Sequence, residues 1–144
     1  MTNQYISEIF ANISKAKTRS EKKTILLANK SNSTFRFILQ GTFDPSVEWT
    51  VPTIPKFKGS DKPLELTDMN LFASVPKCSI FVKGHPKSAP VKLKKAKEIL
   101  NEILEMMHKD ESTIFAGMLK KKQKCKGLTE KLVLEVFPDL YRKV

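Results

Sequence analysis

The chain has 144 residues, about the length of one ordinary domain, and its hydrophobic content of 40% is too high for a wholly disordered protein. Lys and Arg number 26 against 15 Asp and Glu, which gives a formal net charge of +11. This charge favours polyanionic partners, and no apolar stretch approaches the ~20 residues that a membrane-spanning helix needs.

The first 45 residues predict three helices. The first is marked by apolar residues at helical spacing, Ile6, Ile9, Phe10 and Ile13. Thr18 and Glu21 have the spacing of a capping box and predict the start of the second helix. Ser31 or Ser33 is expected to begin the third, and Pro45 is expected to end it.

Residues 44–63 are predicted to form an extended excursion without a helix. The stretch "VEWTVPTIPKFKG" alternates apolar residues and contains prolines that a helix interior does not tolerate. A loop of this length is unusual unless it binds a partner or contains a short strand. Trp49 and Phe57 either fix the loop to the core or form an exposed aromatic patch for a protein partner.

The following segments predict two more helices. Residues 64–75 are expected to form a short helix that Pro76 ends. Ser88 is expected to cap a longer helix, with Pro90 in its first turn. Its apolar positions follow the helical repeat over more than three turns: Ala96, Ile99, Leu100, Ile103, Leu104 and Met107. This stripe predicts that the helix is the central element of the core.

The last third of the chain predicts two further helices. Asp110 is expected to cap the first of them, and Gly127 separates it from the second. Thr129 is expected to cap the last helix, which Pro138 ends. The whole pattern predicts a single domain over residues 1–144, a compact all-α bundle of six or seven helices.

Lysines are concentrated at an unfavourable end of the helix that is predicted to begin at Ser88. They occupy its first half, at Lys92, Lys94, Lys95 and Lys97. Cations near a helix N-terminus oppose the helix dipole, so this arrangement favours a site for an external anion such as a DNA phosphate. Exposed lysines have small effects on stability, so the same order also arises by chance.

No motif for catalysis or metal binding is present. Cys78, Cys125, His85 and His108 lack the spacing of zinc ligands, and the two cysteines are expected to be reduced, packed thiols. The sequence has no nucleotide-binding loop and no serine hydrolase motif. We therefore expect neither an enzyme nor a cofactor. The N-terminal residues lack a secretory signal, which predicts a cytoplasmic protein.

Four segments resemble the N-terminal DNA-binding domain of ATP-dependent DNA ligases, particularly those of tailed phages. The last of them, "KCKGLTEKLVLEVFPDL", is similar to the turn between two helices of that domain. The first, "YISEIFANISKAKTRSEKKTILLANKSNSTFRFIL", resembles its first helices. "LELTDMNLF" and "FVKGHPKSAPVKL" correspond to its "LTLTDM" segment and to a turn that leads into a helix. The basic residues before Gly127, with Lys126 apparently inserted, depart from the ligase pattern.

The resemblance implies an all-α domain that holds duplex DNA through its phosphate backbone with little sequence preference. The adenylation motif K-x-D-G of the ligases is absent, so the resemblance implies a non-catalytic, stand-alone protein of phage type in the host cytoplasm. The expected DNA-binding residues are Lys83, Gly84, Lys87, Ser88, Lys94, Lys95, Lys120, Lys121, Lys122, Lys124, Lys126, Gly127 and Thr129. The alternative is a protein-interaction module that binds RNA polymerase or a sliding clamp, with Trp49 and Phe57 in the interface.

Overall fold

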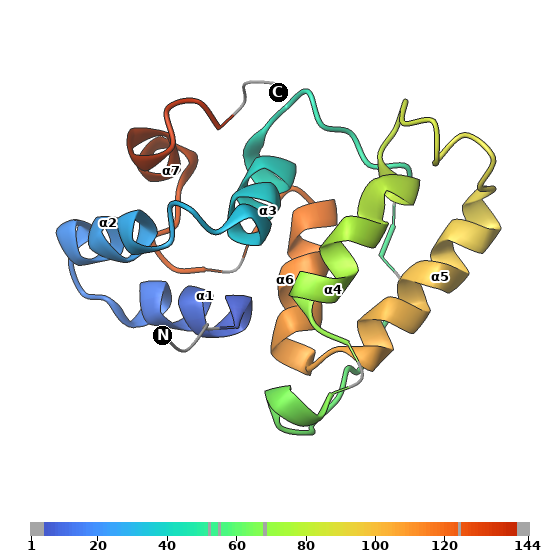
Figure 1. Ribbon diagram of the computed structural model, residues 1–144, viewed down its shortest axis with the longest axis horizontal. Helices are drawn as coiled ribbons and strands as arrows, with labels where there is room; N and C mark the ends of the chain where they lie inside the picture. Colours follow the sequence, from blue (N-terminus) through green and yellow to red (C-terminus); the bar gives the residue numbers. More distant parts are fainter. Residues whose placement is uncertain (1–4, 52, 55, 68, 124, 141–144) are drawn as a thin grey trace.

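The computed structural model describes residues 5–51, 53–54, 56–67, 69–123 and 125–140. In this part of the chain the backbone forms helices and isolated bridge pairs, without a strand (Figure 1). The elements in order are α1 (Ile6–Lys15), α2 (Arg19–Ala28), α3 (Ser33–Phe43), the 3-10 helix η1 (Leu64–Leu66), α4 (Leu71–Ser74), the 3-10 helix η2 (Val75–Phe81), α5 (Leu93–Met106), α6 (Lys109–Leu119) and α7 (Glu130–Val136). The predicted all-α fold is confirmed.

The most buried helix is α6, because residues 114–119 are all buried. Helices α1, α3 and α5 pack against it, and Figure 1 shows it between α3 and α5. The prediction that the helix with the Leu100 stripe is the central one is wrong. That helix, α5, buries Ala96, Leu100, Ile103 and Leu104 on one face and exposes most of its remaining residues to solvent.

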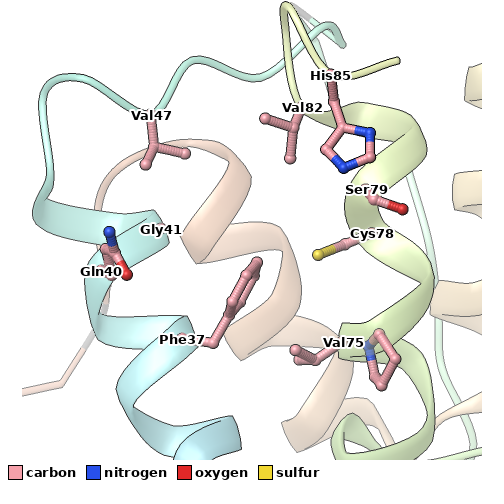
Figure 2. Close-up of a pocket in the computed structure, with 10 residues that line it drawn as sticks. Phe37, Gln40, Gly41, Val47, Val75, Cys78, Ser79, Val82 and His85 are labelled. Atoms are coloured by element: carbon pink, nitrogen blue, oxygen red, sulfur yellow. The ribbon is translucent and has the colours of Figure 1, made fainter. Parts of the chain in front are cut away.

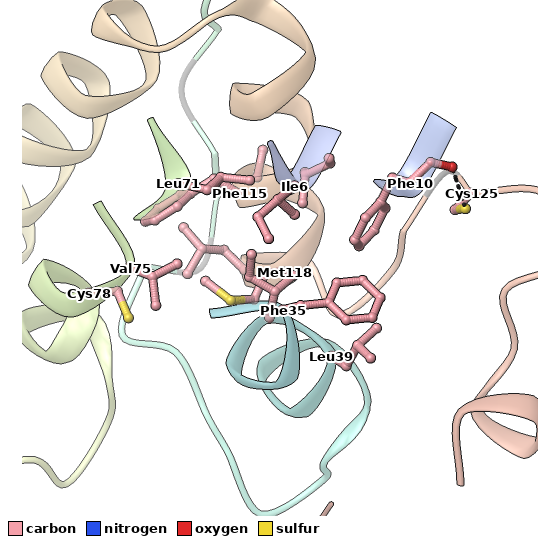
Figure 3. Packing of buried hydrophobic residues seen from close by; sticks show 14 of the residues in the cluster. Ile6, Phe10, Phe35, Leu39, Leu71, Val75, Cys78, Phe115, Met118 and Cys125 are labelled. Carbon is pink, nitrogen blue, oxygen red and sulfur yellow. Dashed lines mark hydrogen bonds between the residues drawn. The ribbon is translucent and has the colours of Figure 1, made fainter. Parts of the chain in front are cut away.

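Phenylalanine rings connect helices that are distant in sequence. The ring of Phe35 in α3 meets Phe10 of α1 edge to face, with ring centroids 5.8 Å apart. The ring centroid of Phe137, which follows α7, lies 6.3 Å from that of Phe35. Phe81 and Phe115 form a third edge-to-face pair at 6.5 Å and join η2 to α6. Figure 3 shows Phe35 and Phe115 among the other buried residues of this core.

Two predicted helix caps are confirmed. The hydroxyl oxygen of Thr18 accepts a hydrogen bond from the Glu21 N–H at 3.1 Å. The hydroxyl oxygen of Thr129 accepts one from the Leu132 N–H at 3.2 Å. The third helix begins at Ser33, with Asn32 as its cap, so the boundary is within one residue of the prediction.

The predicted caps Ser88 and Asp110 are wrong. The Ser88 hydroxyl donates to the His85 carbonyl at 2.8 Å within a turn, and α5 begins only at Leu93. Asp110 lies inside the first turn of α6, and its N–H donates to the His108 imidazole at 3.1 Å. In the first case a local side-chain bond stabilises a turn where the cap was expected, and in the second the His108 side chain caps α6 in place of Asp110.

The α-helix before Pro76 ends at Ser74, but the chain stays helical beyond it. The chain continues from α4 directly into η2, and Pro76 occupies the first turn of η2. A proline is tolerated there because its missing N–H has no helical partner at that position. The segment is therefore helical from Leu71 to Phe81, first as an α-helix and then as a 3-10 helix.

The described residues of the 44–63 excursion contain no helix, as predicted, and are held at two places. Near the start, the Thr50 N–H donates to the Phe81 carbonyl at 2.6 Å and the Lys83 N–H donates to the Glu48 carbonyl at 2.8 Å. Near the end, the Glu105 carboxylate accepts hydrogen bonds from the Lys58 and Gly59 N–H groups, both at 2.7 Å. None of the helices in the described ranges combines the length and the apolar character needed to cross a membrane.

Candidate nucleic-acid interface

The residues predicted to bind DNA lie in two segments. The first basic segment, residues 83–95, contains the connection from η2 to α5 and the first turn of α5. The second basic segment, residues 120–129, connects α6 to α7. In Figure 1 the first lies beside the N-terminal end of α5, whereas the second runs from the end of α6 toward α7.

The first basic segment presents exposed lysines. Lys83, Lys87 and Lys94 are exposed, and Lys83 is 3.6 Å from the exposed carboxylate of Glu48. Lys95 is also exposed and lies 3.9 Å from Glu98. Exposed pairs at these distances contribute little to stability, so these lysines remain able to contact an anion.

Gly84 and Ser88 of the same segment differ in their exposure to solvent. Gly84 has a φ of 86°, and a Cβ built on it meets no atom within 4 Å, so its backbone is open to solvent. Ser88 is buried, and its hydroxyl group binds the His85 carbonyl. The Ser88 side chain therefore shapes the turn and is not available to contact DNA.

Lys121 is a structural residue. It has a φ of 62°, and the N–H groups of Lys121 and Lys122 donate to the carbonyls of Met118 (3.1 Å) and Gly117 (2.9 Å), which is the hydrogen-bonding pattern of a Schellman motif at the end of α6. Its ammonium group then donates to three backbone carbonyls, those of Gly41 (2.9 Å), Asp44 (2.6 Å) and Val47 (2.8 Å). The amine is thus used to cap the end of α3 and is not presented to DNA.

A second lysine with the same role is Lys22, which sequence reasoning missed. It is buried, and its ammonium group donates to the carbonyls of Ile13 (2.6 Å), Ala16 (2.8 Å) and Lys126 (3.2 Å). It therefore caps the end of α1 and fixes the second basic segment against α2. Gly127 has a φ of 78°, and a Cβ there would lie 2.5 Å from the Lys22 side chain, so this position requires glycine.

The remaining predicted residues of the second basic segment differ in their exposure and in their role. Lys120, Lys122 and Lys126 are exposed. Thr129 is exposed, but its hydroxyl group caps α7. Lys124 lies outside the described residues.

Residues 44–51 connect the two basic segments. The Lys121 ammonium binds the carbonyls of Asp44 and Val47, and one residue further on the Glu48 carbonyl accepts from the Lys83 N–H. Lys83 and Lys121, which are more than thirty positions apart in the sequence, are thereby both bonded to one short stretch of backbone. The first half of the excursion is the element that joins them.

A surface pocket lies between α3 and η2, beside this connection. It has a volume of about 310 Å³. Figure 2 shows Phe37 and Cys78 directed toward its interior, with Val47, Val82 and His85 around one end. The full lining is Phe37, Gln40, Gly41, Val47, Val75, Pro76, Cys78, Ser79, Val82 and His85. Sequence reasoning did not identify this pocket.

Burial and hydrogen bonding shift the pKa values of three side chains in or near the pocket. Burial acts to raise the pKa of Asp44, but hydrogen bonds from Ser46 and Gln40 outweigh it and hold that pKa below its usual value. Burial lowers the pKa of Lys121, and the Asp44 carboxylate partly offsets this effect. Burial raises the pKa of the Cys78 thiol to about 12, so this group is protonated and neutral near pH 7.

A buried carboxylate was also missed by sequence reasoning. Glu111 of α6 is fully buried, and its oxygens accept from the N–H groups of Ser7 (2.7 Å) and Leu71 (3.1 Å). These N–H groups belong to the first turns of α1 and α4, so one side chain caps two helices. Burial raises the pKa of Glu111, although both backbone hydrogen bonds act in the opposite direction.

Trp49 and Phe57 do not form an exposed aromatic patch. Both side chains are half-buried and pack against the core. The Trp49 indole N–H donates to the Gly41 carbonyl at 3.1 Å. This geometry corresponds to the other alternative from the sequence, in which the two rings fix the excursion to the core.

The structural role of Lys121 gives a direct prediction. Lys121→Met should lower the free energy of unfolding by about 1.5 to 3 kcal/mol, because three carbonyls lose a charged donor. Lys122→Met, at an exposed neighbouring position, should change it by less than about 0.5 kcal/mol. Urea denaturation of the two variants measures the difference. Equal effects would show that water replaces the ammonium without loss.

The fold and the candidate site define a small, basic, all-α protein with two lysine-rich segments beside a surface pocket. The chain belongs to a family of unknown function, DUF6433, which it matches over residues 9–125. The match includes the pocket and the first basic segment and ends inside the second. No curated protein matches the chain.

Proposed function

We propose that the protein binds duplex DNA through the phosphate backbone, with little sequence preference and without catalysing a reaction. The observation that carries this proposal is the connection of two groups of exposed lysines by residues 44–51. The groups are Lys83, Lys87, Lys94 and Lys95 on one side and Lys120, Lys122 and Lys126 on the other. Lysine is a point charge suited to phosphates, whereas bases are more often read by arginine.

The resemblance to the DNA-binding domain of ATP-dependent DNA ligases supports the same proposal. In those enzymes the domain holds the duplex by backbone contacts, and the segments that resemble it here overlap both basic segments, at residues 83–93 and 124–129. An exposed aromatic patch at Trp49 and Phe57 would have favoured the alternative, a protein-interaction module that binds RNA polymerase or a sliding clamp. Trp49 and Phe57 pack on the core instead, so this observation gives that alternative no support.

Binding to duplexes of unrelated sequence at several salt concentrations tests the proposal. Each lysine that neutralises a phosphate releases counterions, so log K should fall linearly with log salt, with a slope of about −0.9 per contact. We expect a slope of about −4 to −6 and similar affinities for all sequences. Affinity that is independent of salt would contradict backbone binding.

We further expect that the protein does not accept adenylate from ATP. The K-x-D-G motif, whose lysine carries AMP in the ligases, is absent from the sequence. Incubation with radiolabelled ATP and Mg²⁺ should therefore leave the protein unlabelled after denaturing electrophoresis. A labelled band at the mass of the chain would contradict the non-catalytic part of the proposal.

A further inference from the structure

We propose that the pocket between α3 and η2 binds an unpaired nucleobase of the bound DNA, so that the protein prefers duplexes with an extrahelical nucleotide. The inference rests on the proposed DNA binding and adds a ligand class to it. It is carried by the position of the pocket between the basic segments, by its aromatic wall and by its polar groups.

The location of the pocket connects it to both basic segments. Val82 and His85 of its lining belong to the turn that carries Lys83 and Lys87. Gly41 and Val47, also in the lining, are two of the residues whose carbonyls bind the Lys121 ammonium. A DNA strand that passes between the exposed lysines of the two segments therefore crosses close to the pocket. This charge complementarity selects a ligand attached to a phosphate backbone rather than a neutral apolar molecule.

The pocket has the size and the walls that a flat aromatic ligand requires. Its volume of about 310 Å³ is at the lower end of the range of ~300 to 1,000 Å³ for ligand pockets. Phe37 is 37% exposed although it is a large aromatic residue, and Figure 2 shows its ring directed into the pocket. Aromatic side chains bind bases by stacking on their π-faces, and this mode tolerates any base.

Besides Ser79, the lining contains the polar side chains of His85 and Gln40. The Nδ1 atom of His85 accepts a hydrogen bond from the Lys87 N–H at 3.0 Å, so the neutral ring carries its hydrogen on Nε2 and can donate from there. The amide nitrogen of Gln40 donates to the Asp44 carboxylate at 3.3 Å, which leaves its carbonyl oxygen to accept from a ligand. A donor and an acceptor among mainly apolar lining residues suit the edge of a nucleobase, which also carries both kinds of group.

Three duplexes of the same base-paired sequence test the inference: a perfect duplex, one with an extra thymidine and one with an extra abasic nucleotide at the same position. The last two have the same number of phosphates and differ in the base alone. We expect fluorescence anisotropy at fixed salt to show about 5- to 150-fold tighter binding of the thymidine duplex than of the abasic duplex.

Phe37→Ala identifies the pocket as the origin of that preference. The variant should bind the thymidine and abasic duplexes equally, while its affinity for the perfect duplex stays unchanged. Leu27→Ala, which truncates an apolar side chain that is 50% exposed on α2 and does not line the pocket, should keep the full preference. Circular dichroism verifies that both variants are folded.

Each outcome decides a different statement. Equal affinity of the wild-type protein for all three duplexes overturns the nucleobase site and leaves the proposed DNA binding intact; it is the result expected if the pocket serves a protein partner. A preference that survives in Phe37→Ala places base recognition elsewhere. Failure to bind any of the duplexes overturns the proposed function itself.

Discussion

Phe115→Ala is expected to lower the free energy of unfolding by about 3 to 5 kcal/mol, the largest stability effect that we predict for a single substitution. Phe115 is fully buried in α6, the helix against which α1, α3 and α5 pack. Its ring also meets Phe81 edge to face at 6.5 Å, so truncation removes this contact and leaves a cavity in the core. Figure 3 shows the ring close to Leu71 and Ile6.

Chemical denaturation followed by circular dichroism measures this effect. Leu66→Ala is the matched control, because Leu66 is 64% exposed and should tolerate truncation with a change below about 0.5 kcal/mol. A loss of less than about 1 kcal/mol in Phe115→Ala would contradict the assignment of α6 as the most buried helix of the core.

Much of the helical structure could be predicted because its signals are local. The apolar repeat of Ile6, Ile9, Phe10 and Ile13 coincides with the buried face of α1. Thr18 and Thr129 form the predicted caps, since a threonine needs only an N–H three residues further on. Periodicity and capping depend on neighbours within one or two turns, and these are visible in the sequence.

Other helix boundaries depend on which of several possible local hydrogen bonds forms, and the sequence does not show which one is favoured. Serine is a residue type that often caps helices. The Ser88 hydroxyl nevertheless donates to the carbonyl of His85, three residues earlier, and the helix starts at Leu93. The central position of α6 could not be predicted either. The stripe of α5 is more regular in sequence, but burial depends on how many other helices pack around an element, which is a property of the tertiary arrangement.

The sequence was sufficient to predict which lysines belong to the candidate site, but not which of them bind DNA and which stabilise the fold. Lys120, Lys121 and Lys122 are consecutive lysines that no sequence pattern distinguishes. Of the three, only Lys121 donates from its ammonium group to the backbone carbonyls of Gly41, Asp44 and Val47. Those partners are more than seventy positions away in the chain, so no local pattern identifies them. The pocket was missed for the same reason, because α3 supplies one wall and η2 the other.

The second prediction with a large effect concerns the exposed lysines of the second basic segment. Neutralising Lys120, Lys122 and Lys126 to Gln removes three candidate phosphate contacts and preserves Lys121, which supports the fold. The slope of log K against log salt should become flatter by about two to three units. All sequences should lose affinity alike, because phosphate contacts position a protein without reading bases. The free energy of unfolding should stay nearly unchanged, since the three side chains are exposed.

A second triple variant separates local contacts from net charge. Lys56, Lys58 and Lys62 are exposed, and the backbone at Ser60 between them pairs with His108, next to the start of α6. The second basic segment begins at the other end of α6, so the control lysines lie away from the proposed DNA path. Their replacement by Gln gives the same net charge as the first variant.

The salt dependence of duplex binding, measured side by side for the wild-type protein and the two triple variants, is the most direct test of the proposed function. We predict that the slope becomes flatter by two to three units for the variant at positions 120, 122 and 126 and changes by less than about one unit for the control. Equal slopes for the two variants would contradict the proposal, because the affinity for DNA would then depend on the total charge of the protein and not on the second basic segment.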